Sequence, residues 1–68
     1  MDWKERITID AAVLCGKPVI RDTRIAVELI VDLLAQGWTV AQILESYPRI
    51  CHDDVIACLR YASEALKA

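Results

Sequence analysis

The basic side chains that could do chemistry together are Lys17, Arg21 and Arg24, which lie within one short stretch of the chain. Ammonium and guanidinium groups neutralise phosphates, and each neutralised phosphate releases counterions and adds affinity that does not depend on base sequence. A structural interpretation is also open, because Arg21 and Arg24 could pair with nearby acidic side chains such as Asp22 and order this segment. The stretch therefore predicts either contacts to a nucleic-acid backbone or an ordered arm.

Arg60 is a further candidate for contacting nucleic acid, and it falls in the last predicted helix. In a helix-turn-helix protein the exposed side chains of this helix reach base edges in the major groove. The predicted outward face of the helix carries Asp53, Asp54, Ala57, Arg60, Tyr61 and Glu64. Acidic groups outnumber basic ones on this face, so we expect it to meet solvent or protein. Any DNA binding should come mainly from the arm.

The nucleophilic and metal-binding residue types are Cys15, Cys51, Cys58 and the single histidine, His52. An odd number of cysteines without a C-x-x-C pair is typical of free thiols in a reducing compartment, and the spacing fits no common zinc motif. A catalytic set needs a nucleophile and a base that converge in space, whereas consecutive residues at a helix start diverge. The sequence therefore predicts no catalytic residues, no metal site, no cofactor and no enzymatic activity.

Composition narrows the choice of partner. The 68 residues carry a formal charge of −2 with a pI of about 5.1, and 56% of them are hydrophobic. Nucleic-acid modules are usually basic overall, so DNA binding here would need a local patch or a dimer groove. Neither a signal peptide nor an apolar run long enough to span a membrane is visible, which predicts a cytoplasmic protein without membrane contact.

Two short β-branched segments, at 7–9 and 18–20, precede the helical part of the chain. A compact connection closed by Gly16 separates them. Isolated hairpins are marginally stable in water, and these segments are very short. We therefore expect them to pair across a two-fold axis or to pack on the helices.

Three helices are predicted after the arm. The first covers 26–36 and ends at Gly37, after which Trp38 should pack back on Leu33. A capping box at 39–42 starts the second, which ends at Pro48. The third begins near residue 52, and its expected apolar stripe is Val55, Leu59, Ala62 and Leu66. The predicted fold is mostly α: one domain over 1–68, in which a short β arm (1–25) precedes a homeodomain-like, helix-turn-helix bundle (26–68).

The first helix carries more apolar surface than one core requires. Its apolar positions spread over roughly 200° of the helical wheel, whereas an ordinary surface helix has a stripe of about 100°. A chain of this length also buries only about 60% of its unfolded surface. We therefore predict a homodimer, whose interface residues are Ile7, Ile9, Val19, Val27, Ile30, Val31 and Leu34.

The segment from Cys15 to Ile25, with the Gly-Trp-Thr, Tyr-Pro and Asp-Val-x-x-Cys-Leu-x-Tyr-Ala motifs that follow, resembles the domain-of-unknown-function family 433. The resemblance implies a tri-helical, homeodomain-like antitoxin that binds and inhibits a PIN-like ribonuclease toxin and regulates its own operon through operator DNA. The family usually has glycine where this chain has Asp22, and proline where it has Ala26. Two alternatives stay open: a stand-alone helix-turn-helix DNA-binding regulator and a structural oligomerisation module.

Overall fold

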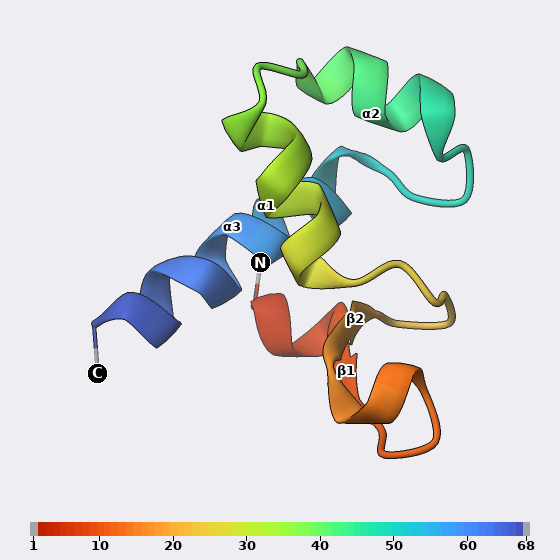
Figure 1. Cartoon of the computed structure of the whole chain (residues 1–68), viewed down its shortest axis with the longest axis vertical. Coiled ribbons are helices and arrows are strands. Elements are labelled where there is room, and N and C mark those ends of the chain that lie inside the picture. The colour runs from red at the N-terminus through yellow and green to blue at the C-terminus, as the bar shows by residue number, and fades with distance from the viewer. Residues whose placement is uncertain (1, 68) are drawn as a thin grey trace.

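The structure is a computed structural model that describes residues 2–67. Two short 3-10 helices and two strands come first: Trp3–Glu5, β1 (Ile7–Ile9), Leu14–Gly16 and β2 (Pro18–Ile20). Three helices follow: α1 (Val27–Ala35), α2 (Val40–Ser46) and α3 (His52–Leu66). Figure 1 shows the helices on one side of the molecule and the small sheet, with its connecting loop, on the other. The predicted mostly helical fold with a short N-terminal β segment is confirmed.

The two strands pair with each other inside one chain. They are antiparallel, with Ile7 opposite Ile20 and Ile9 opposite Pro18. An isolated bridge between Val19 and Ala26 extends the pairing towards α1. The two strands pair because the helices support them: Ile7 and Ile20 belong to the same buried cluster as the cores of α1 and α3. Within the described residues the hairpin thus needs no second copy of the chain to complete it.

The predicted end of α1 is confirmed in detail. Gly37 has a φ of 97°, a left-handed conformation that glycine adopts without a Cβ penalty. The N–H of Trp38 donates to the carbonyl of Leu33 at 3.0 Å, and the N–H of Gly37 donates to that of Leu34 at 3.0 Å. These are the two hydrogen bonds of a Schellman motif. They turn the chain sharply into α2.

Capping boxes begin both remaining helices. Thr39 accepts from the N–H of Gln42, and the Gln42 side chain accepts from the N–H of Thr39, as the sequence predicts. At the start of α3, Asp54 accepts from the N–H of Cys51 at 2.9 Å. Each box satisfies N–H groups that the first helical turn leaves without a partner.

The buried face of α3 differs from the predicted stripe. Asp54 and Ala57, which we expect to be exposed, are 9% and 0% exposed. Leu59 and Leu66, expected in the core, are 40% and 86% exposed. These two expectations are wrong because the fully buried residues of α3 lie in its first two turns, where Arg6 pairs with the buried carboxylate.

The residues predicted for a dimer interface divide into two groups. Ile7, Val19, Val27 and Ile30 are at most 5% exposed and lie in the interior of a single chain. Ile9 is exposed, and Val31 and Leu34 are half-buried. The wide apolar arc of α1 is explained largely by its own core, since the helix contacts the sheet as well as the other two helices. A dimer would have to use the second group.

Candidate anion-binding groove

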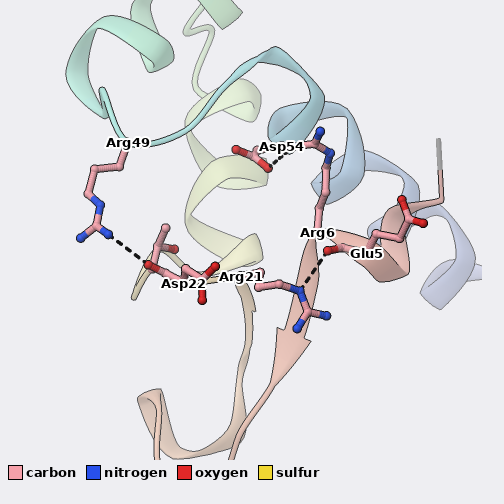
Figure 2. Close-up of a pocket in the computed structure, with 7 residues that line it drawn as sticks. Glu5, Arg6, Arg21, Asp22, Arg49 and Asp54 are labelled. Carbon is pink, nitrogen blue, oxygen red and sulfur yellow. Dashed lines mark hydrogen bonds and ion pairs between the residues drawn. The ribbon is translucent and has the colours of Figure 1, made fainter.

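A polar groove lies where β2 runs into α1 and faces the turn between α2 and α3 (Figure 2). It consists of two adjoining hollows of about 440 and 500 Å³. Arg21, Asp22, Thr23 and Arg49 line both hollows. The first hollow is completed by Glu5, Arg6 and Asp54, and the second by Thr8, Asp10, Val13, Val19 and Arg24. We call this surface the arginine groove.

Arg21 directly follows β2, and backbone carbonyls hold its guanidinium in place. Its Nε donates to the carbonyl of Glu5 at 2.9 Å, and one terminal nitrogen donates to that of Lys4 at 3.3 Å. Its backbone N–H also donates to the carbonyl of Arg6 at 2.7 Å, continuing the strand pairing. Carbonyls orient the side chain without cancelling its charge, so Arg21 both orders the N-terminal segment and stays cationic.

Arg49 reaches the groove from the opposite side. It lies in the turn between α2 and α3, next to Ile50, which is 6% exposed and anchors that turn in the core. One terminal nitrogen of Arg49 donates to the carbonyl of Asp22 at 3.3 Å, as Figure 2 shows. Sequence reasoning missed this residue, because a lone arginine after a proline has no pattern that relates it to a segment 27 positions earlier.

Residues 20–25 form the turn that presents Arg24. The Thr23 hydroxyl donates to the carbonyl of Ile20 at 2.7 Å and accepts from the N–H of Ile25 at 3.0 Å. Asp22 has a φ of 63°, a left-handed conformation that aspartate tolerates better than most residues. The turn that a family glycine would normally make is therefore kept, with a carboxylate added at its tip. Arg24 itself is exposed on the wall of the groove.

Carboxylates also line the groove, but three of its arginines form no ion pair with them in the described residues. Within residues 2–67, ion pairs to carboxylates involve Arg6, Lys17 and His52, and none involves Arg21, Arg24 or Arg49. Arg6 differs from these three arginines because it donates to Asp54 at 3.0 Å, and this hydrogen bond raises the pKa of Arg6 above its ordinary value. Arg6 therefore completes the wall as part of a structural pair.

The remaining predicted basic residues lie elsewhere. The Lys17 ammonium pairs with the Glu28 carboxylate at 2.5 Å, and this hydrogen bond raises the pKa of Lys17. Arg60 is exposed on α3 and lines neither hollow. Of the four basic residues singled out from the sequence, the structure therefore brings two, Arg21 and Arg24, into the groove and adds Arg49.

A second surface, which we call the apolar surface, lies between β2, α1 and α3. Its hollow of about 310 Å³ is lined by Lys17, Pro18, Val27, Glu28, Val31, Tyr61 and Ala62. We include in this surface Leu59 and Leu66, which are exposed on the outer half of α3, the part that extends away from the other helices in Figure 1. On α3, Tyr61 meets Trp3 edge to face at 5.1 Å, and the Trp3 indole N–H donates to Glu64 at 2.6 Å.

The thiols and carboxylates form no site of their own. No group of three or more cysteine, histidine, aspartate or glutamate side chains is placed to hold a metal ion in the part of the chain that the structure describes. Cys15 and Cys51 are exposed, whereas Cys58 is buried in the core. Burial raises the pKa of the Cys58 thiol to about 12. None of the helices described is long and apolar enough to cross a membrane.

The buried thiol predicts a loss of stability at alkaline pH. Because the pKa of Cys58 rises from 9.0 unfolded to about 12 folded, ionisation favours the unfolded chain once the pH passes 9. We expect the urea midpoint to fall between pH 9 and pH 11 in a chain with serine at positions 15 and 51. Adding Cys58→Val to that chain should flatten the fall. Equal falls in both chains would contradict the assignment.

The fold is that of a small three-helix protein with a two-stranded sheet at its N-terminus. Residues 7–62 match the family described as "Protein of unknown function (DUF433)", and the chain belongs to this family. The crystal structure of a DUF433 member protein from Anabaena variabilis ATCC 29413 is similar, with a TM-score of 0.86 and 31% sequence identity. The match covers 91% of this chain and 61% of that one. No curated protein matches the chain.

Proposed function

We propose that this protein is a non-catalytic antitoxin of the cytoplasm, which binds and inhibits a PIN-like ribonuclease toxin and also binds the operator DNA of its own operon. The chain belongs to the DUF433 family, and the resemblance to that family implies an antitoxin, which supports this proposal. Its task is then recognition, and the two surfaces described above serve different partners. The apolar surface receives protein, and the arginine groove receives nucleic acid.

The observation that carries the proposal is the exposed apolar face on the outer half of α3. Leu66 is 86% exposed and Leu59 is 40% exposed, and their separation of seven positions, about two helical turns, places both on the same side of the helix. The helix is held on its other side by Trp3, so these leucines sit on a positioned element. Amphipathic helices commonly bind a partner by laying such an apolar face into a groove. We assign this face to the nuclease.

A second copy of the chain is the other protein partner in this proposal. The dimer contact is assigned to α1, where Val31 borders the apolar hollow and Leu34 is half-buried. Val31 and Leu34 are predicted interface residues that keep accessible surface. This assignment places the dimer contact on α1 and the nuclease contact on the outer half of α3.

Co-expression with the tagged product of the adjacent reading frame tests the function, which requires that product to be a PIN-like ribonuclease. The full chain should co-purify with the tagged nuclease and suppress its cleavage of RNA. Leu59→Glu combined with Leu66→Glu should weaken the association by at least about tenfold, as expected when apolar anchors are lost from an interface. Ala41→Glu is the matched control, since it places the same charge on an exposed site of α2.

The result for the wild-type chain comes first, because it tests the antitoxin function itself. If it neither co-purifies with the nuclease nor slows RNA cleavage, the antitoxin function is wrong. If the chain inhibits the nuclease but the double leucine variant, folded by circular dichroism, inhibits equally well, the function stands and the contact surface is elsewhere.

A further inference from the structure

We propose that the arginine groove is a clamp for the phosphodiester backbone of duplex DNA, formed by Arg21, Arg24 and Arg49, and that Asp22 limits its affinity. The inference deepens the operator-binding part of the proposed function. It is independent of toxin binding, because the clamp and the outer half of α3 share no residue.

The first argument concerns charge. The second hollow carries Arg21, Arg24 and Arg49 against two carboxylates, Asp10 and Asp22, and so has one excess positive charge in a chain of net charge −2. In the first hollow arginines and carboxylates are equal in number, so the excess is confined to the end of the groove that holds Arg24. No carboxylate forms an ion pair with any of these three guanidinium groups within residues 2–67. A bound phosphate would therefore meet available guanidinium groups without first breaking a salt bridge.

The second argument concerns preorganisation. Carbonyls of Lys4 and Glu5 hold Arg21, and the carbonyl of Asp22 holds Arg49. Holding a long side chain in place before binding reduces the entropy lost when the ligand arrives. Each guanidinium keeps further N–H groups beyond those used, and its planar fork suits phosphate oxygens. Arg24 adds an exposed arginine to the lining of the second hollow.

The third argument concerns the kind of ligand. The hollows are open at the surface and adjoin one another through four shared residues, which suits an extended chain of phosphates better than one enclosed small anion. Backbone contacts of this kind position a protein on DNA and carry no sequence information directly. The clamp thus predicts binding that is nearly independent of base sequence. Base reading would have to come from elsewhere.

Asp22 lowers the affinity of the clamp for phosphate. It lies in both hollows, and its carboxylate would repel a phosphate held by the flanking arginines. Its φ of 63° is a conformation that asparagine and glycine also accept, so either can replace it without new backbone strain. A variant with an uncharged residue at position 22 should therefore bind the same DNA more tightly.

The test measures binding of the full chain to a fluorescent duplex of arbitrary sequence over a series of salt concentrations. Asp22→Asn should tighten binding about threefold to tenfold, the range expected for removing one nearby like charge. Arg24→Ala and Arg49→Ala should each weaken it, and each should lower the slope of log K against log salt by about 0.9. Arg60→Ala, an exposed arginine outside the groove, is the matched control.

Arg21→Ala removes hydrogen bonds that order the N-terminal segment, so Arg24 and Arg49 carry the test and circular dichroism checks every variant. Unchanged binding by both the Arg24 and Arg49 variants, or loss of binding only in Arg60→Ala, would overturn the clamp. So would NMR shifts at Arg24 and Arg49 with inorganic phosphate but none with the duplex. A failure to inhibit the toxin would not change the DNA-binding result, so the two experiments distinguish the two proposals.

Discussion

Replacing Ile30 by glutamate is expected to unfold the chain. Ile30 is 0% exposed and lies in the central cluster with Ile20, Ile43 and Val55. An isolated carboxylate in such a site loses its hydration without gaining a partner, at a cost of several kcal/mol or more. Small proteins have total stabilities of about 5–15 kcal/mol, and a domain of this size lies at the low end of that range. Circular dichroism and the loss of dispersed NMR signals would report the result.

Two companion variants make this prediction specific. Ile30→Val removes one methylene group and should cost about 0.5–1.5 kcal/mol while the fold is kept.

Val31→Glu changes the neighbouring, half-buried position. We expect it to stay folded and to shift the mass in light scattering from about twice 7.6 kDa to 7.6 kDa. A folded Ile30→Glu protein would contradict the described core, and a monomeric wild-type chain at micromolar concentration would contradict the dimer.

The second large effect is expected at Asp54. Its carboxylate accepts from the Arg6 guanidinium at 3.0 Å and from the N–H of Cys51 at 2.9 Å. Asp54→Ala removes the helix cap and leaves both donors without this acceptor. We expect a loss of about 2–3 kcal/mol in the free energy of unfolding, the scale of a hydrogen bond to a charged group together with a cap. Urea denaturation measures it.

Asp53 provides a control on the same turn of α3. Its side chain is 57% exposed and lies 3.6 Å from Arg6, so solvent screens the pair. Asp53→Ala should therefore cost at most about 0.5–1 kcal/mol, as exposed ion pairs do. If the Asp53 and Asp54 variants lose equal stability, the buried cap and ion pair are not what joins the N-terminal segment to α3.

Local signals in the sequence predicted the elements and their ends. Gly37 ends α1, Thr39 and Gln42 cap α2, and the two acidic residues after His52 mark the start of α3, because each acts through neighbours within one turn. The basic arm was visible for the same reason, since Arg21 and Arg24 lie in one short stretch. The motif of that stretch was also enough to indicate the DUF433 family, which the comparison confirms.

Only the tertiary structure decided what each helix face meets. Periodicity identifies an apolar stripe but not the point at which a helix leaves the core, so it predicts Leu59 and Leu66 in the interior although both are exposed. The sequence predicts Asp54 on the surface because the partner that compensates its burial, Arg6, lies 48 residues away. Arg49 lies in the turn between two helices, and the packing of that turn brings it to the same groove as Arg21 and Arg24. No spacing along the chain predicts this arrangement. The arginine groove is thus a product of long-range packing, whereas the elements that build it are local.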